Sequence, residues 1–343
     1  MDKNKRSRIY LLVLMLVIFV VWTYRENQPK EVYLQGTTMG VIPYNIKYLD
    51  KKQRNFKNQI DSILVDFNQA LSTYVPDSEI SRFNQTGQVQ FDYPYFYEVL
   101  KASKEVFHET NRSFDPTVGP LVDAWGFGDG EIMGPDSAQV DSLLKYVGFE
   151  KLEFNQKQVS SNQSSLKLNF SAIAKGQAID VVFEYLKSQG FENIMVEIGG
   201  EVRAMGQNVD GDTWTIGIEV PDERRIGGLF DAIYLDNRGM ATSGNYRNFR
   251  VLDDGRKVAH TINPATGYPQ LQTLLSATVI ANDCMYADAY ATACMVMGLE
   301  ESKQLIESNA TLEAYFIFAN ESGEMVTYIS PGLEEIVLSK ESE

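Results

Sequence analysis

An acid and a hydroxyl lie four residues apart in the stretch from Ala281 to Met297. This stretch reads ANDCMYADAYATACMVM, and its apolar residues and alanines predict a buried helix. Asp288 and Thr292 would then share one helical face. A buried carboxylate needs a partner, and two oxygen ligands on one face suit a hard cation such as Mg²⁺. The alternative is a buried aspartate that caps a loop or pairs with an arginine.

The chain has two histidines, and histidine is the side chain that most readily exchanges a proton near neutral pH. His108 lies in a predicted amphipathic helix among lysines and glutamates, so we expect it at the surface. His260 directly precedes the turn sequence TINPATG, at a predicted strand end. His260 is therefore the candidate general acid or base, with a hydrogen-bonded core histidine as the alternative.

A possible anion-binding turn lies in the sequence LNFSAIAKGQAID, where a strand ends at Phe170 and a helix is predicted over Ala174–Gln189. The first N–H groups of a helix are unpaired and attract phosphate, and Lys175 adds a positive charge there. The P-loop pattern is absent, and many such turns are purely structural. Further on, the stretch Glu197–Glu201 ends a strand with two glycines, which allows either close approach of a ligand or a simple bulge.

Composition limits the classes of function. The chain has 343 residues, is 44% apolar and carries a net charge of −15, which argues against nucleic-acid binding but not against an anion held by a cation. Cys284 and Cys294 would lie about 15 Å apart along one helix, so a disulfide between them is not expected. Two histidines and two cysteines also exclude a zinc-finger type of site. Aromatic residues at Tyr74 and at positions 125–127 could stack on a flat ring or belong to the core.

The N-terminus has the pattern of a secretory signal or signal anchor. An apolar run, Ile9–Trp22, follows four cationic residues, Lys3, Lys5, Arg6 and Arg8. No small-x-small cleavage site follows, so we expect residues 9–24 to remain as a membrane anchor, with cleavage as the alternative. We expect residues 1–30 to form the anchor and linker.

Residues 31–343 are expected to form one integrated domain. Predicted strands and helices mix without strict alternation, which favours an α+β fold over a doubly wound sheet. The segment Leu152–Phe170 is predicted to hold two strands around a polar turn at Ser160–Ser165.

Eight motifs occur in an order that resembles the ApbE family of FAD:protein FMN transferases. Together they extend from Thr37 to Gly298. They read TTMG, STYVPDSEISRFN, FDPTVGPLVDAWGFG, SAIAKGQAID, EIGGEVRAMG, ATSGNYRNF, AHTINPATGYP and MYADAYATACMVMG.

The resemblance implies an enzyme that binds FAD as substrate and, with Mg²⁺ (Mn²⁺ or Ca²⁺ would also suit oxygen ligands), breaks its pyrophosphate. FMN would be attached by a phosphoester to a Thr or Ser of a target protein, with release of AMP. The implied targets are flavoprotein subunits of sodium-pumping NADH:quinone oxidoreductase or of Rnf-type complexes. The implied fold is α+β with mixed or antiparallel sheets related to the tunnelling fold. With the anchor, the implied place is the periplasmic side of a bacterial inner membrane.

The resemblance also assigns residues. The metal ligands would be Asp288, Thr292 and the backbone carbonyl of Ala172, and His260 would be the base for the acceptor hydroxyl. Many members have Asp where this chain has Asn169, which keeps an acceptor but loses a charge. The flavin contacts would be Met39, Tyr74, Ser113, Phe114, Asp115, Asn169, Lys175 and the backbone near Ile262.

Two other functions remain open at this stage. The same metal site would serve an FAD pyrophosphatase in which water replaces the acceptor hydroxyl. A flavin-binding protein without turnover is the third hypothesis, although the presence of Asp288, Thr292 and His260 argues against it.

Overall fold

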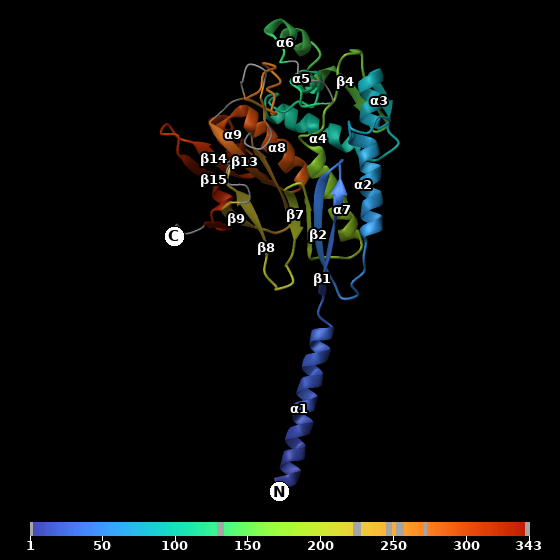
Figure 1. Cartoon of the computed structure of the whole chain (residues 1–343), viewed down its shortest axis with the longest axis vertical. Coiled ribbons are helices and arrows are strands. Elements are labelled where there is room, and N and C mark those ends of the chain that lie inside the picture. Colours follow the sequence, from blue (N-terminus) through green and yellow to red (C-terminus); the bar gives the residue numbers. More distant parts are fainter. Residues whose placement is uncertain are drawn as a thin grey trace.

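An eight-stranded antiparallel sheet forms the centre of the fold, with strand order β1-β2-β6-β7-β10-β13-β14-β15 (Figure 1). The computed structural model describes residues 3–128, 134–221, 228–244, 249–251, 257–270 and 273–339. The strands are β1 (Lys30–Thr38), β2 (Ile42–Asp50), β6 (Ile194–Ile198), β7 (Glu201–Met205), β10 (Arg238–Gly244), β13 (Leu274–Ala281), β14 (Glu313–Ala319) and β15 (Met325–Ile329).

Three smaller sheets accompany it in the described residues. The first has the order β16-β9-β8, the second β3-β5-β4, and the third is the pair β11-β12. Their strands are β3 (Gln88–Gln90), β4 (Leu152–Asn155), β5 (Gln158–Ser161), β8 (Trp214–Glu219), β9 (Leu229–Leu235), β11 (Phe249–Val251), β12 (Lys257–Ala259) and β16 (Val337–Ser339).

The helices of the domain gather at one side and one end of the large sheet, with α2 and α7 beside β1 and β2, and with α4 at the top of the view next to α8 (Figure 1). They are α2 (Lys57–Leu71), α3 (Glu79–Thr86), α4 (Phe96–Glu109), α5 (Gly119–Ala124), α6 (Ser137–Leu144), α7 (Ala174–Ser188), α8 (Cys284–Met297) and α9 (Leu299–Ser308). The mixed α+β class and the antiparallel sheets expected from the sequence are confirmed.

The prediction that a turn lies at Ser160–Ser165 is wrong. Strands β4 and β5 pair around positions 156 and 157, where the N–H of Lys157 donates to the side chain of Asn155 (2.8 Å) and closes a tight turn. Strand β7 was not expected from the sequence. It forms because Gly199 and Gly200 both adopt positive φ (63° and 104°), which reverses the chain directly after β6.

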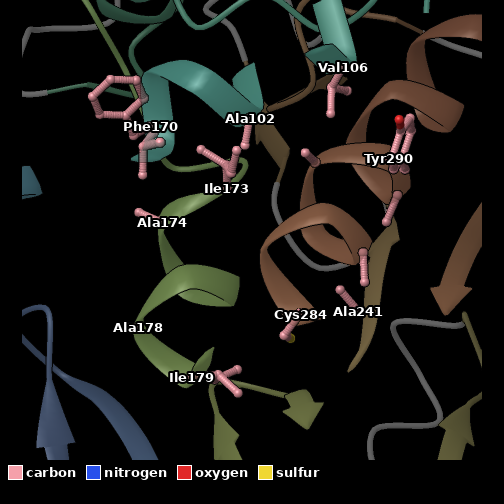
Figure 2. Close-up of a cluster of buried hydrophobic side chains, with 14 of the residues drawn as sticks. Ala102, Val106, Phe170, Ile173, Ala174, Ala178, Ile179, Ala241, Cys284 and Tyr290 are labelled. Carbon is pink, nitrogen blue, oxygen red and sulfur yellow. The ribbon is translucent and has the colours of Figure 1, made fainter. Parts of the chain in front are cut away.

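The contact between α7 and α8 is unusually close because a glycine lies on α7 at the crossing. A Cβ on Gly176 would lie 2.2 Å from the carbonyl oxygen of Cys284, and one on Gly239 of β10 would lie 2.3 Å from the Cys284 N. The start of α8 is thus held between a helix and a strand with no side chain between them. Apolar side chains from α4, α7, α8 and β10 fill the surrounding core (Figure 2).

The long N-terminal helix α1 (Lys3–Glu26) extends away from the domain (Figure 1). Its large apolar side chains from Tyr10 to Trp22 are exposed. None of the described helices is both long enough and apolar enough to span a membrane.

Candidate functional site

A cavity of about 240 Å³ lies where the start of α7, the middle of α8, the turn between β6 and β7 and the end of β10 meet. Two loops, around positions 113–118 and 260–264, complete its wall. The structure brings most of the predicted site residues together here. Those that line the cavity are Ser113, Phe114, Asp115, Asn169, Ala172, Lys175, His260, Ile262, Asp288 and Thr292.

Asp288 is 2% exposed and caps a neighbouring helix. Helix α7 begins after Ile173, whose side chain cannot accept a hydrogen bond. The N–H of Gly176 in the first turn of α7 donates to Asp288 Oδ2 at 3.1 Å, so an acid on α8 replaces the missing cap. The expectation that this buried acid needs a partner is met by a helix start and by Lys175, not by an arginine.

Lys175 is shared between two buried acids. Its Nζ lies 2.8 Å from Glu201 Oε1 and 3.6 Å from Asp288 Oδ1. Burial lowers the pKa of Lys175, but the carboxylates of Asp288 and Glu201 outweigh burial and raise that pKa above its usual value. For Glu201 burial is the larger effect and raises the pKa to about 7, whereas Lys175 acts to lower it. This part of the cavity therefore contains one ammonium group near two acidic side chains.

The predicted metal ligands border this charged group. Thr292 lies one turn after Asp288 on α8, and its Oγ1 is 3.1 Å from Ser243 Oγ at the end of β10. Ala172 precedes α7 in the turn closed by the N–H groups of Ile173 and Ala174, which both donate to Phe170. Asp288, Thr292 and Ala172 all line the cavity, and carboxylate, hydroxyl and carbonyl oxygens are the donors that Mg²⁺ prefers.

Within the described residues no group of three or more His, Cys, Asp or Glu side chains is arranged to hold a metal. The predicted ligand set is of another kind, since it contains one carboxylate. A buried Glu201 Oε2 without a hydrogen-bond partner at the same cavity indicates that the negative charge there is not fully satisfied by the described residues. The donor set present therefore fits a hard divalent cation.

The carboxylate of Asp115 is occupied within its own loop. It accepts hydrogen bonds from the N–H and the hydroxyl of Thr117 (2.8 and 2.6 Å) and from the N–H of Phe149 (3.1 Å). The 113–115 segment therefore borders the cavity, while the Asp115 carboxylate is engaged by Thr117 and Phe149.

Asn169 closes the turn before α7. Its Oδ1 accepts hydrogen bonds from the N–H of Ser171 (2.9 Å) and from the Ser171 hydroxyl. It also lines a second cavity of about 1040 Å³, next to the first, and Tyr74 lies in that second wall with 70% of its surface exposed. The structure thus places Tyr74 in the neighbouring cavity.

Met39 does not line the first cavity. It lies in the turn between β1 and β2 with a positive φ of 48°, an uncommon conformation for a residue other than glycine. The same hairpin reaches the cavity wall further on, because the N–H of Gly199 donates to the carbonyl of Pro43 (3.0 Å). The structure therefore brings the hairpin to the cavity wall through Pro43, while Met39 itself packs against the apolar core.

His260 lies at the start of a loop held by side chains of its own and by α5. The side chain of Asn263 accepts from the N–H groups of Ala265 and Thr266, and Trp125 Nε1 donates to the carbonyl of Gly267 (2.8 Å). The His260 ring is half-buried and lies edge-on to Phe127, with ring centres 6.4 Å apart. Trp125 is thus a core residue that positions the loop.

Three polar residues of this wall received no role from the sequence, and they are Glu201, Thr242 and Ser243. The two glycines before Glu201 were the available signal, since they indicated close approach of another group. The position of Glu201 beside Lys175 depends on pairing in the sheet, which the sequence alone does not specify.

Comparison with known proteins identifies the family. The model of the ApbE family matches residues 37–316. The chain belongs to the ApbE family. It is 39% identical over 297 residues to the FAD:protein FMN transferase of Vibrio cholerae serotype O1, a match that covers 83% of this chain and 86% of that protein. With the FAD:protein FMN transferase of Haemophilus influenzae it shares 36% identity over 330 residues, covering 92% and 94%.

Solved structures agree with this ApbE fold. The flavin transferase ApbE from Vibrio cholerae superposes with a TM-score of 0.78 at 36% identity, covering 90% of this chain and 99% of that one. The flavinyl transferase ApbE from Pseudomonas stutzeri gives 0.78 at 32% identity, covering 90% and 97%. The relatives are transferases by name, and the fold around the cavity is shared with them.

Stability should depend on pH through Asp115, since burial raises its pKa from 3.8 to about 6. Between these values the folded protein holds a proton that the unfolded chain has released, so stability falls as pH rises through this range. The loss attributable to Asp115 is about 3 kcal/mol. In Asp115→Asn this contribution disappears, so the difference in unfolding free energy between the wild type and the variant should be largest near pH 4 and smaller at pH 7.

Urea unfolding of both proteins across this range measures the difference. Asp141→Asn, at an exposed position, is the matched control and should follow the wild type. A wild-type advantage over Asp115→Asn that stays constant with pH would contradict the assignment.

Proposed function

We propose that this protein is a Mg²⁺-dependent FAD:protein FMN transferase. The observation that carries the proposal is one cavity that joins Asp288 and Thr292 on α8, Lys175 at the start of α7 and His260 on its loop, in a chain of the ApbE family. The hydroxyl of a Thr or Ser in a target protein would attack the phosphorus of the FMN half. The bond to the AMP half would break, and AMP would leave.

Asp288, Thr292 and the carbonyl of Ala172 would hold the metal. When bound, Mg²⁺ would polarise phosphoryl oxygens and offset charge on the departing AMP. The protein is strongly acidic, with a net charge of −15, so an anionic dinucleotide needs local positive charge. A bound cation would supply that charge, because Lys175 is already shared between Glu201 and Asp288 and the N–H groups of Ala174 and Gly176 at the start of α7 are already paired.

His260 would accept the proton of the attacking hydroxyl. His260 lines the cavity, and its loop is braced internally by Asn263 and joined to the segment after α5 by the hydrogen bond from Trp125 to the carbonyl of Gly267. The proposed acceptors are flavoprotein subunits such as those of sodium-pumping NADH:quinone oxidoreductase or Rnf-type complexes, which supply the Thr or Ser hydroxyl.

The activity is tested by incubating the protein with FAD, Mg²⁺ and such a subunit. We expect flavin fluorescence on the acceptor after denaturing electrophoresis, and AMP in solution. Asp288→Asn keeps an acceptor for the N–H of Gly176 but loses the charge, so transfer should fall by at least about 100-fold. Free FMN without labelled acceptor would instead indicate hydrolysis, and unchanged FAD would indicate binding alone.

His260→Ala separates proton transfer from binding. Because general base catalysis contributes about 100-fold or more, the variant should lose that factor in the transfer rate while its FAD affinity stays within about threefold of the wild type. Isothermal titration with FAD and single-turnover labelling give the two quantities. Equal losses in both would show that the histidine serves binding.

We also propose that α1 anchors the protein in the bacterial inner membrane, with the domain on the periplasmic side. The exposed apolar side chains from Tyr10 to Trp22 and the cationic residues before them support this placement. The full chain should remain with membranes after an alkaline wash, and residues 31–343 should not. Recovery of the full chain in the soluble fraction would refute the anchor.

A further inference from the structure

We infer that Glu201 is a positioning residue that holds Lys175 away from Asp288 and so keeps that carboxylate available to a divalent cation. This inference rests on the metal site of the proposed function. It concerns a residue to which the family resemblance assigned no role.

The first argument is the position of the ammonium group. Lys175 Nζ makes its short contact with Glu201 Oε1 at 2.8 Å, whereas its distance to Asp288 Oδ1 is 3.6 Å, longer than a hydrogen bond. Both acids are almost fully buried, with 6% and 3% of their side chains exposed. The lysine therefore pairs with Glu201 and only approaches Asp288.

The second argument concerns the two oxygens of Asp288. Oδ2 accepts from the N–H of Gly176, which fixes the orientation of the carboxylate at the start of α7. Oδ1 faces the longer contact with Lys175. A cation at Asp288 would compete with the Lys175 ammonium for this oxygen. The more strongly Glu201 attracts the ammonium, the more readily the cation binds to Asp288.

The third argument is the rigidity of the anchor. Glu201 is the first residue of β7 and follows the turn of Gly199 and Gly200. A Cβ on Gly199 would lie 3.7 Å from Lys175 Cδ and 3.8 Å from Glu201 Oε2, so the turn lies directly against both side chains. Pairing of Glu201 with Ile198 fixes the backbone from which this carboxylate reaches Lys175.

Charge adds a fourth argument. Glu201, Asp288 and Lys175 together carry one net negative charge, which favours a cation. Without the charge of Glu201 the three groups would be neutral, and the carboxylate left within 4 Å of Lys175 Nζ would be Asp288. A direct ion pair between these two residues would then occupy the oxygen that the cation needs.

The test measures Mn²⁺ binding to the full-length protein without FAD at pH 8, by the electron paramagnetic resonance signal of free Mn²⁺. Glu201→Gln should weaken Mn²⁺ binding about tenfold. Glu184→Gln, an exposed acid on α7, is the matched control and should bind Mn²⁺ like the wild type. Thermal unfolding of each variant confirms that it is folded.

Rescue distinguishes positioning from a direct role. In the double variant Lys175→Met, Glu201→Gln no ammonium remains to occupy Asp288, so Mn²⁺ affinity should return to within about threefold of the wild type. Equal affinities of Glu201→Gln and wild type would overturn the inference, as would a double variant that binds as weakly as Glu201→Gln. A wild type that binds no Mn²⁺ would overturn the metal site itself and this inference with it.

Discussion

Two helices that cap each other hold the candidate site together. Asp288 on α8 accepts from the first turn of α7, and Asp180 on α7 accepts from the N–H groups of Cys284 and Met285 at the start of α8 (3.0 and 2.8 Å). Because each helix depends on an acid from the other, neither can shift without losing a cap. Gly176 permits this arrangement, since any larger residue would separate the two helices.

This arrangement places negative charge in the interior and balances it locally. Asp180 is paired with Arg203 of β7 at 2.9 Å, and Glu201 on the same strand is paired with Lys175. Burial raises the pKa of Asp180 to about 7, against the effect of Arg203. One strand of the central sheet thus supplies a cation to one side of the helix pair and an acid to the other, which connects the charge balance of the site to the sheet.

The sequence was most informative where chemistry follows from local spacing. Asp288 and Thr292 share a helical face because of helix periodicity, and Lys175 lies in the first turn of α7 because that helix begins directly after the turn closed on Phe170. The strand expected to end at Phe170 does not form, since between β5 and α7 only Lys167 makes a bridge, to Val118. Contacts that depend on sheet pairing are harder to predict, because the paired strands are distant in the sequence. Nothing local indicates that Glu201 lies beside Lys175, and the side chain of Asn155 closes the β4–β5 turn although the stretch Ser160–Ser165 is more polar. Asp115 shows the same limit, since an acid in a loop can equally bind a ligand or its own backbone.

The central claim is that Asp288, Thr292 and the carbonyl of Ala172 hold a divalent cation at the cavity that receives FAD. Anomalous diffraction from crystals grown with Mn²⁺ and FAD tests this most directly. The account predicts one strong manganese peak in contact with these three groups and with the pyrophosphate. Bound FAD with no manganese there, or with manganese only at other residues, would contradict it.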